Sequence, residues 1–291
     1  MGDRASVREV LNLSGLKQSM AQLTRKARRT LHRVCTPIGP HTFRSSLERL
    51  IGSGTDVLFV HASLSSCGGF TAGPSDVVRA LSEFCGTLAF PTHTYCYPPS
   101  PNEIAPLFDP RTIPSRTGRL TEIFRTQPGT IRSIHATHSL AALGREAGEI
   151  CSDHYCCDTP CGVGTPYRRL VHREAGILML GVTFHSYTLF HTAEDESGSE
   201  FAYESGTLDR LRVLDEHGNE RDCWSKRQSR APRRFREAGE LLENVGLVRR
   251  LTLGRAYLLY VPDCSRAHDF LVDRLRKTPN FLYQSCKQSL Q

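Results

Sequence analysis

The chain has 291 residues, with 39% apolar and 23% charged residues, the proportions of an ordinary soluble globular protein. That length allows one large domain or two small ones with a substantial core. Every apolar run is shorter than the roughly 20 residues that cross a bilayer, and the N-terminus lacks the compact apolar core of a secretory signal, so neither feature is expected.

The formal net charge of +7 is unevenly distributed. Residues 1–40 carry eight Lys/Arg against two acids, a net +6, which leaves about +1 for the rest. The excess of basic residues therefore lies in an N-terminal extension, residues 1–40. It does not favour nucleic-acid binding by the rest of the chain. Residues 7–34 have an imperfect helical apolar stripe, and residues 35–40 have the composition of a linker. Packing on the body is the simplest use of that stripe, with self-association into a homo-oligomer and contact with an anionic surface as alternatives.

The pattern from residue 41 onward predicts one domain, 41–291, in which buried strands alternate with helices. Such an order favours a three-layer α/β/α fold with a largely parallel or mixed central sheet. A proline-rich stretch, 97–114, should be an irregular arm, and 210–225 should form a β-hairpin around Gly218. The expected helices are 43–51, 74–84, 118–127, 145–152, 235–244 and 265–276, and the expected buried strands are 56–60, 86–90, 177–182 and 254–261.

The eleven cysteines are odd in number and lack the rhythm of a disulfide scaffold, which favours a reduced, cytoplasmic protein. The one dense cluster contains Cys151, Cys156, Cys157 and Cys161, with His154 nearby. It lacks a C-x-x-C pair, and vicinal cysteines are poorly placed for tetrahedral ligation, so we expect buried thiols and no metal.

Polar and glycine-rich segments follow several predicted strands. They are 61–69 (HASLSSCGG), 91–94 (PTHT), 132–139 (RSIHATHS) and 158–166 (DTPCGVGTP). Ligands in open α/β sheets bind at the carboxyl ends of the strands, where these segments should lie. Small hydroxyls and glycines there let a carbonyl or phosphate approach the backbone, although an ordinary tight turn would have the same composition.

His191 and Glu194 lie in SYTLFHTAED and are three residues apart. On a helix this spacing puts both side chains on one face, where the carboxylate can orient the imidazole and stabilise its charged form. The histidine would then act as a general base near neutral pH. The spacing also arises by chance in many helices, so its interpretation depends on the surrounding segments.

Several motifs in this order resemble the aminoglycoside 3-N-acetyltransferase (antibiotic N-acetyltransferase) family. They are H-A-S-L-S-S, G-T-L-A-F-P-T-H-T, F-D-P, R-S-x-H-x-x-H-S-x-A-A-L-G, D-T-P-C-G-x-G-T-P and F-H-T-A-E. The resemblance covers about residues 41–283 and excludes the basic extension. One departure is Ala136, where the family usually has proline.

The resemblance implies a fold distinct from the common acetyltransferase fold, and acetyl transfer from acetyl-coenzyme A to an amine of an aminoglycoside antibiotic. It assigns the general base to His191 and its acidic partner to Glu194, with direct transfer and no metal. It places the coenzyme against two groups of residues: Ser63, Leu64, Ser65 and Ser66, then Thr92, His93, Arg132, Ser133, His138 and Ser139. Cys67 and Cys161 leave a covalent route open.

Two charged runs are ambiguous. Asp195, Glu196 and Glu200 follow His191 and either bind a cationic acceptor or form a solvated face. The basic run 226–236 either contacts the coenzyme phosphates or is exposed, and exposure is the simpler expectation.

Three other functions stay open. The acceptor could be an amino sugar in glycan or natural-product biosynthesis. The histidine- and cysteine-rich middle of the chain is also compatible with a metal-dependent hydrolase. The basic extension is compatible with a non-enzymatic protein that binds a surface.

Overall fold

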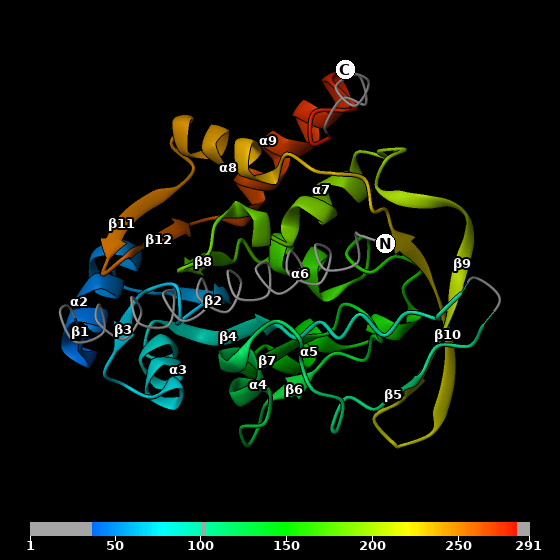
Figure 1. Cartoon of the computed structure of the whole chain (residues 1–291), viewed down its shortest axis with the longest axis horizontal. Helices are drawn as coiled ribbons and strands as arrows, with labels where there is room; N and C mark the ends of the chain where they lie inside the picture. Colours follow the sequence, from blue (N-terminus) through cyan, green and yellow to red (C-terminus); the bar gives the residue numbers. More distant parts are fainter. Residues whose placement is uncertain (1–36, 101–102, 284–291) are drawn as a thin grey trace, which may run out of the picture.

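The computed structural model describes residues 37–100 and 103–283, and its centre is a seven-stranded sheet in the order β11-β12-β8-β2-β4-β7-β6 (Figure 1). The strands are β2 (Thr55–Ala62), β4 (Cys85–Pro91), β6 (Ile131–Arg132), β7 (Leu140–Gly144), β8 (Gly176–Leu180), β11 (Arg249–Leu253) and β12 (Ala256–Val261). Only the central β8, β2 and β4 run parallel, and the strands on either side pair antiparallel. The sheet is therefore mixed, the second of the two arrangements that the sequence allowed.

Helices cover both faces of this sheet, which confirms the three layers. The helices are α2 (Pro40–Ile51), α3 (Pro74–Ser82), α4 (Arg119–Arg125), α5 (Ala147–Cys151), α6 (Pro166–His172), α7 (Leu189–Glu196), α8 (Phe235–Asn244) and α9 (Cys264–Lys277). Alternate residues of β2 reach the two cores: Leu58 and Val60 pack with α2, α3 and α4, whereas Val57 and Phe59 pack with α5 to α9. A strand buried on both faces explains the unbroken apolar run in the sequence.

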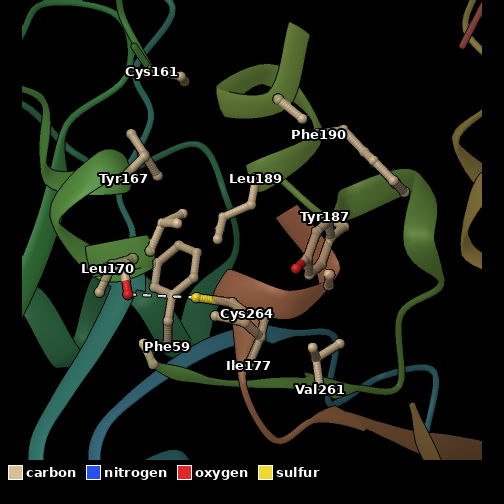
Figure 2. Packing of buried hydrophobic residues seen from close by; sticks show 14 of the residues in the cluster. Phe59, Cys161, Tyr167, Leu170, Ile177, Tyr187, Leu189, Phe190, Val261 and Cys264 are labelled. Carbon is tan, nitrogen blue, oxygen red and sulfur yellow. Dashed lines mark hydrogen bonds between the residues drawn. The ribbon is translucent and has the colours of Figure 1, made fainter. Parts of the chain in front are cut away.

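The core on the α5–α9 side is close-packed around β2 (Figure 2). Phe59 lies edge-on to Tyr167 of α6, with ring centroids 6.0 Å apart. The Cys264 thiol, at the start of α9, donates to the Leu170 carbonyl at 3.4 Å (Figure 2). Full burial of a large apolar side chain such as Phe59 contributes about 1.5–3 kcal/mol. This core fixes the edge of the sheet from which the polar segments project.

A second, three-stranded sheet has the order β10-β9-β5 and lies at one end of the molecule (Figure 1). It comprises β5 (Leu107–Phe108), β9 (Tyr203–Leu214) and β10 (Glu220–Gln228). β9 and β10 form the expected hairpin, with Gly218 in its turn at a φ of +82° that favours glycine. In its described residues the proline-rich arm is irregular as expected, but β5 joins it to β9, and Phe108 is buried against Leu211 and Val213.

Local sequence signals explain where helices begin. Pro74 occupies the first turn of α3, and the Asp76 carboxylate accepts from the Gly73 N–H at 3.0 Å. The Thr165 hydroxyl caps α6 by accepting from the Arg168 N–H at 3.3 Å. Asp263 caps α9 by accepting from the Ser265 N–H at 2.9 Å.

Three expectations need correction. Pro37 and Ile38, which we expected in a linker, form β1 (Pro37–Ile38) and pair with β3 (Gly69–Phe70). The expected strand 254–261 is shorter, because Gly254 belongs to the turn between β11 and β12. The strand β7 and the helix α6 were not expected, because 140–144 and 166–172 are short and no element was assigned to them from the sequence.

The predicted helices of 7–34 lie outside the described residues, so the division into a 1–40 extension and a 41–291 domain stays a prediction. Among the helices of the described residues, none is long and apolar enough to cross a membrane.

Candidate active site

A cavity of about 1000 Å³ opens at the carboxyl ends of the parallel strands β2, β4 and β8. Its walls come from the segments that follow these strands, 61–65, 93–97 and 182–188, together with 116–121 and a stretch before α8. This is the edge at which α/β sheets bind ligands, and the volume is at the large end of the ~300–1,000 Å³ typical of ligand pockets. The cavity therefore lies at the edge of the sheet where the sequence predicted ligand-binding segments.

His191 lines this cavity from α7, and its partner Glu194 lies one turn behind it. The His191 Nδ1 atom is 2.6 Å from Glu194 Oε2, with side-chain exposures of 18% and 0%. A carboxylate can only accept, so Nδ1 carries a proton in this hydrogen bond, and Nε2 is the ring nitrogen that faces away from Glu194. The predicted pair is thus assembled, with the imidazole ring held in one orientation by the carboxylate.

The second oxygen of Glu194 has two further partners. Arg233 Nε donates to Glu194 Oε1 at 2.8 Å, and the Tyr283 hydroxyl donates to the same atom. Burial would raise the pKa of Glu194, but the charges and hydrogen bonds of His191 and Arg233 outweigh it and hold that pKa below its usual value. Glu194 is therefore ionised at neutral pH despite its complete burial.

Arg233 corrects the expectation that the basic run 226–236 is exposed. Its side chain is 10% exposed in the ion pair with Glu194, and Arg227 is 13% exposed in a pair with Asp209. Arg236 does lie at the surface and pairs with Glu240. The run therefore contains both buried and exposed arginines. Its composition alone does not indicate which arginines are buried.

Three residues of the predicted coenzyme loop, Ser63, Leu64 and Ser65, line the cavity. Ser66 does not, and its hydroxyl lies 2.9 Å from Ser63 Oγ. The Ser66 N–H donates to the Ser63 carbonyl at 3.0 Å, which closes the turn. Among the described residues, the Leu64 and Ser65 N–H groups have no hydrogen-bond acceptor. The loop thus presents two backbone donors and hydroxyls beside the cavity.

Thr92, Arg132 and Ser139 lie behind the cavity wall. Arg132 Nε donates to Thr92 Oγ1 at 3.2 Å and to Ser139 Oγ at 3.1 Å. Its other nitrogens donate to the carbonyls of Thr92, Pro110 and Ile113. Each of the three nitrogens of this guanidinium group therefore donates to the protein. The geometry gives these residues a supporting role, and their predicted contact with the coenzyme has no counterpart in the cavity lining.

Ser133 also lies behind the cavity wall. Its hydroxyl lies 2.9 Å from His154 Nδ1 and accepts from the Leu140 N–H at 2.8 Å. The His154 ring stacks on His135 with centroids 4.5 Å apart. None of these side chains lines the cavity.

His93 and His138 do line the cavity, as predicted for the coenzyme site. His93 Nε2 lies 2.7 Å from the Tyr167 hydroxyl, and His138 Nδ1 lies 2.8 Å from Thr137 Oγ1. Burial lowers the pKa of His93 to about 3 and lowers that of His138 well below its usual value. His61 also lines the cavity, and burial lowers its pKa to about 3. All three are therefore neutral polar groups near pH 7.

The acidic run after His191 is not gathered at the cavity. Asp195 accepts from the Tyr203 hydroxyl at 2.5 Å, and Glu196 pairs with Arg168 at 2.6 Å. Glu200 is exposed. None of the three lines the cavity, so their predicted role in binding the acceptor gains no support from the geometry.

The cysteine cluster is spread out. Cys151 and Cys161 are buried, Cys156 is exposed, and Cys157 is half-buried. Within residues 37–100 and 103–283, no three His, Cys, Asp or Glu side chains are arranged to hold a metal ion.

Two further arginines, which sequence reasoning missed, line the cavity near the 63–65 loop. Arg116 and Arg119 are exposed, and neither pairs with a carboxylate of the described residues. The intervening Gly118 approaches the Ala62 carbonyl at the end of β2, and the Thr117 hydroxyl donates to the Pro91 carbonyl at 2.6 Å. These contacts hold the 116–119 segment against the ends of β2 and β4, beside the cavity that both arginines line.

The chain is similar in sequence to known proteins. Residues 59–276 match the sequence model of a family described as aminoglycoside 3-N-acetyltransferase. The chain is 33% identical over 179 residues to aminoglycoside N(3)-acetyltransferase VII of Streptomyces paromomycinus, a match to 54% of this chain and 62% of that relative. The match thus spans less than two thirds of the relative's length.

Solved structures share the fold. The crystal structure of aminoglycoside acetyltransferase AAC(3)-Xa aligns with a TM-score of 0.72 and 25% identity, over 89% of this chain and 100% of that one. The structure of AAC-IIIb, a binary complex with CoASH, aligns with a TM-score of 0.69 and 24% identity, over 83% and 97%. These alignments confirm the expected fold, which differs from that of the common acetyltransferases.

Proposed function

This chain belongs to the aminoglycoside 3-N-acetyltransferase family, and from that premise we propose that it transfers an acetyl group from acetyl-coenzyme A to an amine of an aminoglycoside or related amino sugar. The observation that carries the proposal is the 2.6 Å hydrogen bond between His191 and the buried Glu194, at the wall of a cavity that the 63–65 loop also lines. A base and a set of carbonyl-binding donors are what transfer from a thioester to an amine requires.

His191 acts on the acceptor amine. A protonated amine has no lone pair with which to attack a thioester, so its proton must leave. In this mechanism Nε2 of His191 takes the ammonium proton, which frees the lone pair that attacks the thioester carbon, and the positive charge then spreads over the imidazole ring. Glu194 stabilises that imidazolium through Nδ1, and the low pKa of its carboxyl keeps the negative charge in place.

The thioester oxygen gains negative charge as the carbon–nitrogen bond forms. The Leu64 and Ser65 N–H groups are the best candidates to stabilise it, since both are without an acceptor among the described residues. Thr92, the other candidate from the sequence, uses its N–H on the Ser139 carbonyl at 2.8 Å. When the intermediate collapses, the carbon–sulfur bond breaks, and the coenzyme leaves as a thiolate that takes up the remaining extra proton of the attacking nitrogen as the amide forms.

Direct transfer is favoured over an acetylated cysteine. Burial raises the pKa of Cys67 to about 11 and raises that of Cys161 well above its usual value, so both stay protonated near neutral pH. Neither thiol lines the cavity. A protonated, buried thiol is a poor nucleophile.

Coenzyme A carries phosphates, and the loop end of the cavity suits them. Arg116 and Arg119 are the exposed cations there, and guanidinium groups bind phosphate oxygens in bidentate geometry. We therefore assign the coenzyme to the end of the cavity formed by 63–65 and 116–121. Its thioester would lie near Leu64 and Ser65, within reach of the amine that His191 deprotonates.

We also assign the protein to a reducing compartment, the cytoplasm. The nine cysteines of the described residues are all free thiols, and acetyl-coenzyme A is made inside cells.

The direct test is an acetyl-transfer assay. Purified full-length protein is incubated with acetyl-coenzyme A and a series of aminoglycosides and amino sugars, while the release of free coenzyme thiol is followed. Acetylated product, identified by mass, is expected for at least one amine. Tight binding of coenzyme A without transfer to any amine in the series would contradict the proposal.

A further inference from the structure

The two faces of the central sheet lead to two sides of the cavity. His93, the second residue after β4, lies on the face covered by α6 and α7, because its Nε2 atom is 2.7 Å from the Tyr167 hydroxyl of α6. His191 of α7 lies on the same face. Leu64 and Leu120, from the segments assigned to the coenzyme, pack on the other face with α2, α3 and α4. The part of the cavity beside His93 and His191, which we call the base side, is therefore where an acceptor amine meets the base.

Tyr95 lies on the base side and is bonded to His93. Its hydroxyl is 3.2 Å from His93 Nδ1, and the two rings meet edge to face with centroids 5.5 Å apart. The Tyr167 hydroxyl donates to the His138 carbonyl at 3.0 Å, so it accepts from His93 Nε2. The neutral His93 ring then has Nδ1 free to accept from Tyr95. The Tyr95 ring is thus tethered by its hydroxyl, although the residue lines the cavity and is 47% exposed.

The backbone of Tyr95 is strained. Its φ of +53° lies in the left-handed region, which glycine and asparagine tolerate and a bulky side chain disfavours. The N–H groups of Thr94 and Tyr95 both donate to the Thr137 carbonyl, at 3.1 and 3.2 Å. The next N–H, that of Cys96, donates to the Ala136 carbonyl at 3.2 Å. These bonds hold the strained conformation, and that conformation does not explain why the residue is a tyrosine, which points to a role for its ring.

The cavity wall beside Tyr95 continues to the base. Tyr97 also lines the cavity, and the Arg227 guanidinium group lies over its ring, 5.1 Å from the centroid. Ser229, two residues after Arg227, lines the same cavity. Its carbonyl accepts from Arg233 Nη1 at 2.7 Å, and the Nε atom of the same arginine binds the carboxylate behind the base. A continuous set of contacts therefore joins the tyrosine segment to the base.

We propose that Tyr95 is a specificity-determining residue of the acetyl transfer, whose ring is the platform on which a sugar ring of the acceptor stacks while an amine of that acceptor reaches His191. This inference rests on the proposed function. The apolar face of a sugar ring packs on an aromatic face, and the negative face of the π system attracts a neighbouring ammonium group, so an aminoglycoside suits both. The tether to His93 fixes the ring before the acceptor binds, which reduces the entropy lost on binding.

The test replaces Tyr95 with asparagine, which removes the ring and tolerates the backbone, so the full-length variant should fold like the wild type. Gentamicin and the methyl glycoside of glucosamine are the acceptor probes. We expect KM for the acceptor to rise about tenfold, with kcat and KM for acetyl-coenzyme A within about twofold of wild type, because stacking holds the ground state and the transition state equally. An unchanged acceptor KM, or an equal rise in both KM values, would overturn the inference alone. Transfer by the wild type to neither probe would overturn the acetyl-transfer proposal and this inference with it.

A second variant separates the ring from its hydroxyl. Tyr95→Phe keeps the aromatic face and loses only the hydrogen bond to His93. We expect its acceptor KM to stay within about threefold of wild type, since the stacking surface is intact. An acceptor KM as high as that of Tyr95→Asn would assign the effect to the hydroxyl and overturn the platform.

A matched control separates the ring from the strained backbone. Glu174 has a φ of +50°, is exposed and does not line the cavity. Glu174→Asn therefore makes the same relief of strain away from the site, and its melting temperature should rise while both KM values stay at the wild-type level. A rise in the acceptor KM of Glu174→Asn that matches that of Tyr95→Asn would show that the backbone and not the ring controls binding, and would overturn the inference.

Discussion

Arg233 and His191 bind opposite oxygens of one carboxylate. Arg233 Nε lies 2.8 Å from Glu194 Oε1, and His191 Nδ1 lies 2.6 Å from Glu194 Oε2. The Tyr283 hydroxyl also donates to Glu194 Oε1, so this buried carboxylate has three hydrogen-bond donors. This carboxylate connects α7, the stretch before α8 and the chain after α9. The orientation of the histidine therefore depends on residues that are far apart in sequence.

Replacing His191 with alanine removes the proposed base. We expect kcat for the best amine to fall by about 10²–10⁴-fold, because the amine then has to lose its proton to water. The dissociation constant for coenzyme A, measured by calorimetry, should stay within about threefold of wild type, since the coenzyme is assigned to the other end of the cavity. Turnover like that of the wild type in His191→Ala would rule out this mechanism.

Replacing Glu194 with glutamine keeps the shape of the side chain but removes its charge. We expect a milder loss, about tenfold in kcat, because the imidazolium loses its neighbouring anion but keeps a hydrogen-bonding partner. Single-turnover kinetics with saturating coenzyme would isolate this step. A loss larger than that of His191→Ala would show that the main role of Glu194 is to support the fold.

Replacing Arg233 with leucine should act through Glu194. Without the guanidinium, burial favours the protonated acid, so the pKa of Glu194 rises. A carboxyl with a raised pKa loses its charge at higher pH, so the acidic limb of the kcat profile should move to higher pH. Arg236→Leu is the matched control, because that arginine is exposed and pairs only with Glu240. Identical pH profiles for the two variants would contradict a positioning role for Arg233.

Replacing Arg119 and Arg132 one at a time distinguishes an arginine that binds the coenzyme from one that supports the fold. Arg119→Met should raise the dissociation constant for coenzyme A about tenfold with little change in melting temperature, because its side chain is exposed and unpaired among the described residues. Arg132→Met should instead lower the free energy of unfolding by about 3 kcal/mol, since it leaves buried carbonyls without donors. Denaturant titration and calorimetry on both variants would check this. The reverse pattern would restore the sequence-based assignment of Arg132 to the coenzyme.

Stability should fall in mild acid because of neutral buried histidines. Burial lowers the pKa of His61, His93 and His135 to about 3, below the value near 6.5 of an unfolded chain. The unfolded state therefore binds more protons between these values. The stabilisation is complete above pH 6.5 and is lost as the pH falls toward 3, by up to about 1.4 kcal/mol per pH unit for each group.

His135→Gln tests this most cleanly, because His135 does not line the cavity. Its Nδ1 accepts from the Thr137 and His138 N–H groups, and a glutamine oxygen can take over that role. The variant should be less stable at pH 7, but its stability should fall less steeply between pH 6.5 and 5, by about one proton. Chemical denaturation at several pH values measures the slope, and an unchanged slope would contradict a neutral His135 in the fold.

Much of the fold followed from local signals. The apolar runs of β2, β4 and β8 and the caps of α3 and α9 are encoded within a few residues, and the hairpin follows from alternation around Gly218. The short elements β7 and α6 were not predicted. They have five and seven residues, which are too few for a hydrophobic period to be recognised. The antiparallel flanks of the sheet depend on pairing between distant strands, which no local pattern records.

The sequence by itself determined that His191 and Glu194 share a helix face, that polar loops follow the parallel strands, and to which family the chain belongs. Only the tertiary structure decided which polar residues reach the cavity. Nothing in the sequence distinguishes Arg132 from Arg119. In the folded chain, Arg132 is buried among carbonyl groups, whereas Arg119 lines the cavity. Likewise, Asp195 and Glu196 follow His191 in sequence but are directed to Tyr203 and Arg168. Burial and pairing are properties of contacts between distant segments, so they arise only when the chain is folded.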